Sequence, residues 1–123
     1  MVYLIIPSDN SNLEIDPKYL SLKLRERWPM IDIKYEKSYP MMLLEWQIID
    51  DSINHVGTLH SDKRTIAIDD YPQGIAEFTI WYKKIIAYDH EIFIYHDGNA
   101  EMAVKVTNET SLDRIKNQLD SET

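Results

Sequence analysis

The sequence predicts a single α+β domain spanning residues 1–123, built on a curved, largely antiparallel sheet of about six or seven strands with two or three helices. Composition is the first observation behind this prediction, because 44% hydrophobic and 28% charged residues are the balance of an ordinary globular protein. The second is that most apolar segments are short and follow one another through brief turns, which favours antiparallel neighbours. The third is a helical spacing of apolar residues in the remaining segments. The predicted element order is β-α-β-β-β-β-α-β-β-α.

The N-terminal region predicts a buried strand followed by a helix. Residues 2–6 are an unbroken apolar run, which a proline and a cluster of turn-forming residues then end. Asp16 is a good N-cap, and Pro17 suits the first helical position because its missing N–H costs nothing there. The core-facing stripe of this helix recurs at intervals of four residues and comprises Leu20, Leu24 and Trp28.

A four-stranded meander is predicted next. Residues 31–35 alternate apolar and charged side chains, which is the period of a half-buried strand. Residues 41–49 begin with side chains that are apolar on both faces, which indicates a central strand. Two further strands are expected over residues 53–60, where Gly57 is a candidate bulge, and over residues 65–68.

A second helix should begin near Tyr71. Asp70 followed three residues later by Gln73 resembles a capping box, and Pro72 fits the first turn. The apolar stripe of this helix continues for three turns and comprises Ile75, Phe78, Thr79, Tyr82, Ile85 and Ile86. Such a stripe predicts a helix that packs on the sheet along its whole length.

The C-terminal third predicts a hairpin and a last helix. Residues 92–95 are β-branched or aromatic, residues 102–106 alternate, and the Asp97-Gly98 pair between them favours a tight turn. Thr110 is expected to cap the final helix. The apolar residues of that helix are Leu112, Ile115 and Leu119.

Composition also limits the function classes. The chain has no cysteine, which excludes disulfides, thiolate zinc sites and a cysteine nucleophile, and which favours a reducing compartment. The first apolar run is too short for a signal peptide or a membrane span. We therefore expect a soluble, acidic, cytoplasmic protein that does not bind membranes. The net charge of −8 also opposes general attraction to nucleic acid.

No pattern of enzyme machinery is present. The three glycines lie too far apart to form a phosphate-binding loop. His55 and His60 are five residues apart and fall on opposite faces of a strand, so they cannot share a metal ion. The segments Asp89-His90-Glu91 and His96-Asp97 lie at the two ends of one predicted strand, well over 10 Å apart at about 3.3 Å per residue. The sequence therefore predicts a protein that is not an enzyme and holds no cofactor or metal.

Charge is unevenly distributed along the chain. Residues 17–37 carry a net charge of +3, whereas the other 102 residues carry −11. A basic and aromatic face within residues 18–64 is therefore a possible nucleic-acid or partner surface. Its basic members are Lys18, Lys23, Arg25, Arg27, Lys34, Lys37, Lys63 and Arg64. Of the aromatic residues in this region, Tyr35 and Trp46 belong to apolar stripes, so we expect them in the core.

Apolar side chains outside the expected core stripes predict a second kind of surface. Trp81 borders the stripe of the second helix and Ile80 lies on its far side. With Met41 and Met42 they are candidates for closing a dimer, because exposed apolar patches commonly mark interfaces.

Three segments resemble those of a small, uncharacterised bacterial family associated with cyanobacteria. These segments read LRERWPMIDIKY, LLEWQI and EFTIWYKKIIAYDHEIFIYHDG, and the resemblance covers most of the chain without implying any chemistry. By order of elements, residues 31–86 are also similar to the ββββα unit of the Whirly-type single-stranded DNA-binding fold. That similarity implies a curved sheet that binds nucleic acid as an oligomer.

These observations favour a non-enzymatic binding or protein-interaction module that forms a homo-oligomer or takes a protein partner. One alternative is single-stranded nucleic-acid binding through the basic and aromatic region. A second is an immunity-type inhibitor whose acidic surface blocks a basic toxin.

Overall fold

The computed structural model describes residues 2–35, 42–50, 54–96 and 99–121. The described residues form one seven-stranded sheet in the order β2-β3-β4-β5-β1-β6-β7, and every neighbouring pair is antiparallel. The strands are β1 (Val2–Pro7), β2 (Asp32–Tyr35), β3 (Met42–Ile49), β4 (Asn54–His60), β5 (Ile66–Asp69), β6 (Ile92–His96) and β7 (Asn99–Val106). The helices are α1 (Pro17–Arg27), α2 (Pro72–Ile85) and α3 (Leu112–Ser121). The α+β class, the antiparallel sheet and the element order predicted from the sequence are confirmed.

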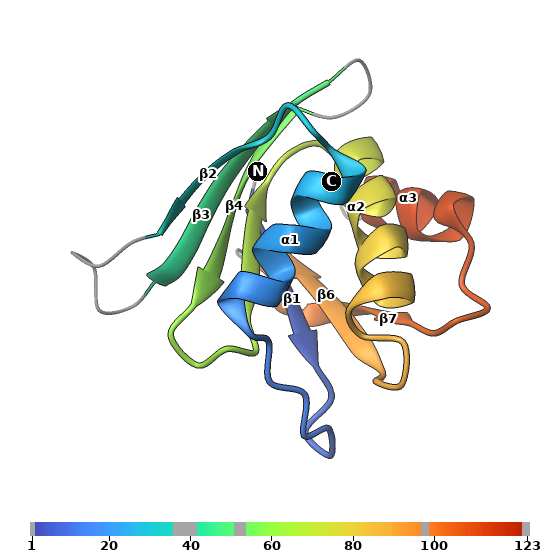
Figure 1. Ribbon diagram of the computed structural model, residues 1–123. Helices are drawn as coiled ribbons and strands as arrows, with labels where there is room; N and C mark the ends of the chain where they lie inside the picture. The colour runs from blue at the N-terminus through green and yellow to red at the C-terminus, as the bar shows by residue number, and fades with distance from the viewer. Residues whose placement is uncertain (1, 36–41, 51–53, 97–98, 122–123) are drawn as a thin grey trace.

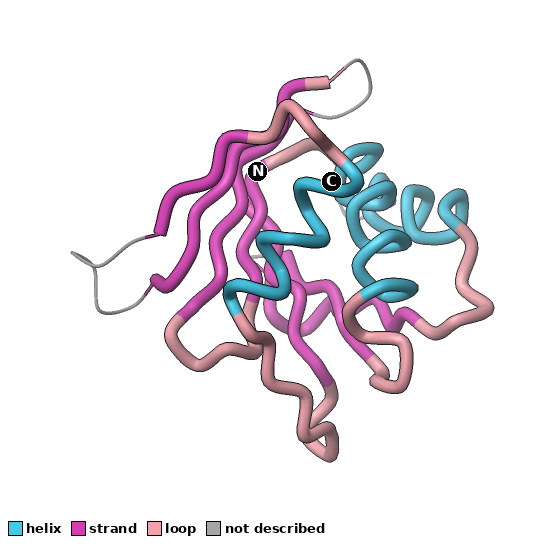
Figure 2. The backbone as a smooth tube through the Cα atoms, in the orientation of Figure 1, coloured by secondary structure: helices cyan, strands magenta, loops and turns pink. Residues whose placement is uncertain are grey.

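The molecule has two layers. Figures 1 and 2 show a curved, open sheet with the three helices on its concave side, α2 lying between α1 and α3. The hydrophobic core fills the space between the layers, and residues from every element except β2 and the ends of the chain contribute fully buried side chains to it. None of the described helices has the length and apolar composition needed to cross a bilayer.

The sheet combines the predicted meander with the predicted hairpin. β2 to β5 follow one another, β6 pairs with β7, and β1 lies between the two units by pairing with both β5 and β6. The segment expected to form a central strand is the interior strand β3, which pairs with β2 and β4 and is second from the edge of the sheet.

The first helix forms as its sequence predicts. The Asp16 side chain accepts a hydrogen bond from the backbone N–H of Lys18 at 3.1 Å, which satisfies one of the free donors at the helix start. The stripe of Leu20, Leu24 and Trp28 is buried.

Both predicted caps of the later helices are wrong. Asp70 does not cap α2, whose N-cap is Tyr71 without a side-chain hydrogen bond. In α3 the Ser111 hydroxyl accepts the N–H of Arg114 at 3.1 Å, whereas Thr110 accepts the N–H of Thr107 in the preceding turn. Asp70 and Thr110 both make hydrogen bonds other than the capping bonds that their spacing suggests.

Two strand details also differ from expectation. Gly57 is not a bulge, since it pairs in register with Trp46 on one side and Ile68 on the other, and the irregularity lies between Met42 and Leu44. Tyr35 is not in the core, because the edge strand β2 leaves half of its surface exposed. Trp46 is buried as expected.

Phe78 of α2 is the centre of an aromatic cluster between the layers. Its ring lies 5.3–6.1 Å from five other rings, measured between centroids. These rings belong to Trp28, Trp46, His55, Trp81 and Tyr82. The cluster joins α1, α2 and the β3–β4 pair, so one side chain connects both layers.

Candidate functional site

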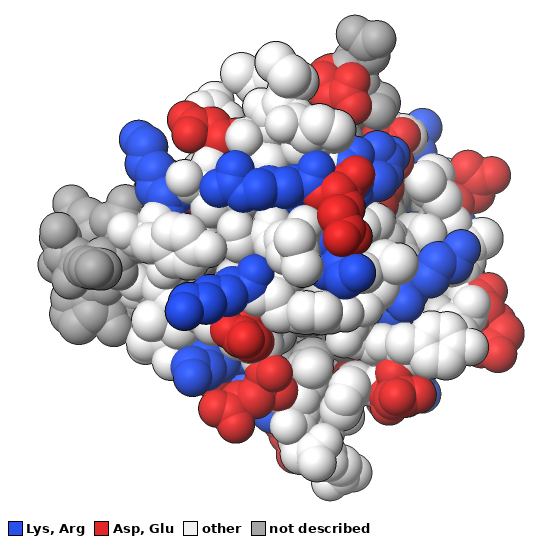
Figure 3. Space-filling view, viewed as in Figure 1, with Lys and Arg blue, Asp and Glu red and all other residues white. Residues whose placement is uncertain are grey.

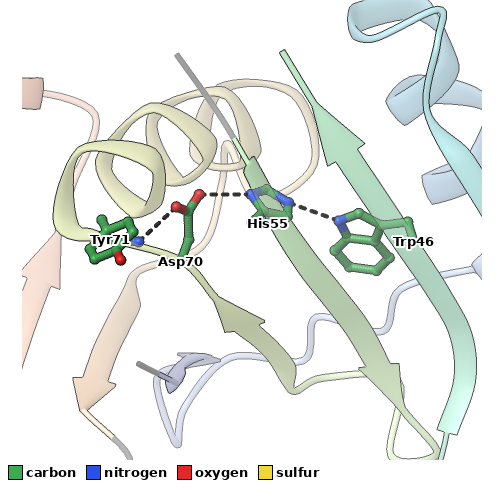
Figure 4. A network of polar contacts seen from close by, with 4 residues as sticks. All are labelled: Trp46, His55, Asp70 and Tyr71. Atoms are coloured by element: carbon green, nitrogen blue, oxygen red, sulfur yellow. Dashed lines mark hydrogen bonds and ion pairs between the residues drawn. The ribbon is translucent and has the colours of Figure 1, made fainter. Parts of the chain in front are cut away.

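A buried polar network lies beside the aromatic cluster. The indole N–H of Trp46 donates to His55 Nε2 at 3.1 Å, and His55 Nδ1 lies 3.2 Å from Asp70 Oδ2. Asp70 Oδ1 also accepts the backbone N–H of Tyr71 at 2.6 Å. Figure 4 shows these side chains in a row from β3 through β4 to the start of α2. We call Trp46, His55 and Asp70 the buried triad.

The hydrogen-bond partners of His55 determine which of its ring nitrogens carries the proton. An indole nitrogen can only donate, so His55 Nε2 must accept and cannot carry a proton. The imidazole proton therefore lies on Nδ1 and is donated to the Asp70 carboxylate. His55 is neutral in this arrangement, and each of its ring nitrogens has a partner.

A paired histidine and aspartate can act as a general base when the remaining imidazole nitrogen faces a substrate. Here the indole of Trp46 occupies that nitrogen, and only 1% of the His55 surface is exposed. An open hollow of about 320 Å³ adjoins the triad and is lined by Asn54, His55, Val56, Asp69, Asp70 and Tyr71. A solute in this hollow does not meet a free imidazole nitrogen. As arranged, the triad connects β3, β4 and the start of α2, and His55 has no free nitrogen with which to act as a base.

Two glycines make room for the buried triad. A Cβ atom at Gly57 would lie 2.3 Å from the Trp46 ring, and one at Gly74 would lie 1.9 Å from Asp70 Oδ2. Real Cβ atoms do not approach other atoms so closely, and both neighbours are buried. Gly57 and Gly74 are therefore required by the close approach of two triad side chains.

Gly57→Ala is expected to lower the free energy of unfolding by about 1–3 kcal/mol, the usual cost of overpacking a well-packed site. The added methyl group displaces the Trp46 indole from His55, which weakens the hydrogen bond as well as the packing. Urea unfolding followed by tryptophan fluorescence measures the loss. Thr58→Ala, one residue along the same strand with its side chain on the other face, serves as the control and should change stability far less. Equal losses in the two variants would contradict the role of Gly57.

The structure does not bring the predicted basic residues together on one face. Lys18, Lys23, Arg25 and Arg27 lie on α1, on the helix side of the sheet. Lys34 pairs in register with Glu45, next to the inward-facing pair of Ile33 and Trp46, and so points to the opposite side. Over α1 the basic side chains are interspersed with acidic and uncharged groups (Figure 3), and Lys23 is paired with Glu26 at 3.2 Å.

The other members of that set have separate positions. Lys63 lies in the turn between β4 and β5, with a positive φ of 62°. The neighbouring Arg64 donates to the backbone carbonyl oxygens of Leu13 and Ser8, at 2.9 and 3.4 Å, which anchors the N-terminal loop. Lys37 lies outside the described residues. The guanidinium of Arg64 therefore already has structural partners.

The predicted self-association residues do not form one patch either. Trp81 packs into the core, with its ring 5.1 Å from that of Trp28, and Ile80 is partly buried against the same core. Met42 begins β3, next to the edge strand β2, and is partly buried. Met41 lies outside the described residues.

The histidine and acidic side chains next to β6 have structural partners. His90 Nδ1 is hydrogen bonded to the Ser11 hydroxyl at 2.6 Å, and Glu91 is paired with Lys105 at 3.2 Å. Asp97 lies outside the described residues. Within the part of the chain that the structure describes, no group of three histidine or acidic side chains is placed to hold a metal ion.

An apolar surface remains on the convex side of the sheet. Leu4 of β1 pairs in register with Tyr95 of β6, and Ile6 pairs with Phe93. All four side chains alternate with buried ones, so they point away from the helices, and all four are partly exposed. We call Leu4, Ile6, Phe93 and Tyr95 the apolar square. A hollow of about 560 Å³ lies over it, bordered also by residues 7–9 and His96.

Sequence reasoning missed the apolar square, although its signal is visible. Residues 2–6 and 92–95 are apolar on both faces, a pattern typical of strands that are covered on both sides. The described helices cover only one side. The second face of β1 and β6 is therefore apolar and has no described helix over it.

Comparison with family models, curated proteins and solved structures gives no match.

Proposed function

We propose that this chain is a non-enzymatic protein-interaction module that binds through the convex face of its sheet. The apolar square is the observation that supports the proposal. Four large apolar side chains on two adjacent strands face away from the core, and among the described residues the helices leave them uncovered. Contiguous exposed apolar side chains of this kind commonly mark a binding surface.

The rest of the convex face differs in character. On β2 to β4 it is mixed, with the polar cross-strand pairs of Lys34 with Glu45 and of Asp32 with Gln47 beside the exposed apolar residues Ile49 and Val56. An apolar area bordered by polar groups is the usual anatomy of an interface. The buried triad, by contrast, holds both imidazole nitrogens of His55 in internal hydrogen bonds. Binding through the convex face therefore has more support than catalysis.

Phe93→Asp is expected to abolish association through this face, because it places a charge within the apolar square. The measurement is affinity capture of the tagged chain from cells that express it, followed by identification of all captured proteins, copies of the same chain included. Thr58→Asp is the matched control, since it adds the same charge to the same face on β4, two strands away from the apolar square. Proteins captured equally by wild type and Phe93→Asp would contradict the proposal. A titration with short single-stranded DNA at low salt tests the nucleic-acid alternative in parallel.

A further inference from the structure

We propose that the occupant of the apolar square is a second copy of this chain, related to the first by a two-fold axis that runs along the strands between β1 and β6. The proposal rests on the proposed function, because both use the same face, and it names the partner.

The register fixes which residues share a row across the convex face. One row crosses β5, β1, β6 and β7 and consists of Ala67, Leu4, Tyr95 and Ala103. The next row crosses β1, β6 and β7 and consists of Ile6, Phe93 and Lys105. Continuing the β1–β5 register by one residue places Thr65 at the β5 end of that second row. The two rows thus contain the apolar square and its immediate neighbours.

A two-fold axis along the strands exchanges β1 with β6 and β5 with β7 while keeping the rows at the same height. Leu4 then faces Tyr95 of the second copy, Ile6 faces its Phe93, and Ala67 faces its Ala103. Each aliphatic side chain of β1 meets an aromatic ring of β6, and each contact occurs twice by symmetry. The square is therefore complementary to itself.

The sizes of the side chains fit this arrangement. The rings of Phe93 and Tyr95 lie 6.3 Å apart along β6, beside the shorter side chains of β1 and the alanine on β5. The axis places the aromatic side chains of each copy over the aliphatic ones of the other. A uniformly twisted sheet is also carried onto a parallel twisted surface by such an axis, so twist does not separate the two faces.

The charges at the margin are complementary as well. The same axis brings Lys105 of one copy opposite Thr65 of the other, and the Thr65 hydroxyl donates to Asp62 Oδ2 at 2.7 Å. Partial burial raises the pKa of Asp62, but hydrogen bonds from Arg64 and Thr65 outweigh it and hold the pKa below its ordinary value. Asp62 is thus an ionised group near Lys105 of the second copy, whose ammonium group is also paired with Glu91 of its own chain. The square itself contains no charge, so the net charge of −8 acts only from a distance.

The size of the face predicts a weak dimer. Four strands about 4.8 Å apart and five residues of about 3.3 Å each give a footprint of at most about 300 Å² per copy, because the outer strands of a convex face curve away from the partner. A standard stable complex buries about 800 Å² per partner, so this contact belongs to the weak class. The dimer should form in a concentration-dependent way, with a dissociation constant in the range of about 10 μM to 1 mM.

Sedimentation equilibrium over that concentration range tests the proposal. We expect wild type and Thr58→Asp to move from monomer to dimer, and Phe93→Asp and Leu4→Asp to remain monomeric at every concentration. Circular dichroism and thermal unfolding confirm that each variant is folded. If an aspartate variant does not fold, Phe93→Ser provides the same test without a charge. A wild type that stays monomeric, or a dimer that persists in the folded square variants, would overturn the proposal.

Cross-linking tests the orientation, since the chain has no native cysteine. Ala67→Cys and Ala103→Cys are prepared separately, mixed and treated with a short bis-maleimide. We expect a cross-linked dimer in the mixture and much less in either variant alone, because only unlike positions face each other. Equal cross-linking of each variant with itself would overturn the two-fold arrangement.

The two proposals fail in distinguishable ways. If wild type is monomeric but its capture of other proteins is lost in Phe93→Asp, the second copy is the wrong partner and the interaction module stands. If Phe93→Asp changes neither sedimentation nor capture, both proposals fail.

Discussion

Phe78→Ala is expected to lower the free energy of unfolding by about 3–5 kcal/mol, the range found when a buried phenylalanine is cut back to alanine. The Phe78 side chain is completely buried and contacts rings from both layers of the structure. Its removal opens a cavity between α1, α2 and the sheet, which the surrounding large rings cannot close by small movements. This loss is a large fraction of the stability of a typical domain, which is about 5–15 kcal/mol.

Urea unfolding followed by circular dichroism measures this effect. Phe78→Leu is the matched control, because it keeps most of the buried apolar volume and removes only the aromatic contacts. We expect a loss of roughly 1–2 kcal/mol for leucine, well below that for alanine. Similar small losses in both variants would show that Phe78 is not the centre of the core.

Asp70→Ala is expected to lower the free energy of unfolding by about 2–4 kcal/mol, because it leaves two donors without their acceptor. These donors are the Nδ1–H of His55, which is buried, and the backbone N–H of Tyr71 at the start of α2. A buried donor that loses its partner bears its full desolvation penalty. The loss should also loosen the connection between β4 and α2.

Thermal and urea unfolding of single and double variants check this prediction. Asp70→Asn restores one acceptor and should recover part of the loss. Combining Asp70→Ala with His55→Leu should cost less than the sum of the two single changes, because leucine removes the donor that the aspartate satisfies. Strict additivity of the two changes would contradict a shared network.

Local patterns predicted the elements well where their causes are local. The N-cap at Asp16, the proline after it and the four-residue stripe act within one helix, and α1 forms as they predict. The meander and the second hairpin likewise depend on strands that follow one another through short turns. The caps predicted at Asp70 and Thr110 show the limit of such patterns. The spacing of a capping residue does not reveal whether another group binds its side chain in place of the helix end.

The buried triad could not be predicted for that same reason. Its members lie on β3, on β4 and at the start of α2, and nothing in their spacing shows that they meet. His55 was correctly placed on the opposite strand face from His60, but its partners depend on how α2 crosses the sheet. The need for glycine at positions 57 and 74 becomes clear only once the triad is in place.

The predicted basic surface was divided by the fold. Residues 18–27 belong to a helix on the concave side, whereas Lys34 lies on a strand and points to the convex side. Residues that are close in sequence need not lie on the same face of the sheet when the chain passes from a helix to a strand. The apolar square was overlooked for the complementary reason, since its members are distant in sequence and become neighbours through the β1–β6 pairing.

Apolar periodicity and turn chemistry act over a few residues, so the sequence predicts the α+β class, the order of ten elements and most of the core-facing residues. Packing between distant segments places β1 between β5 and β6, directs Asp70 to His55 in place of the helix end, and leaves one face of β1 and β6 without a helix over it among the described residues. These features depend on contacts between distant segments, whose energies no local pattern records.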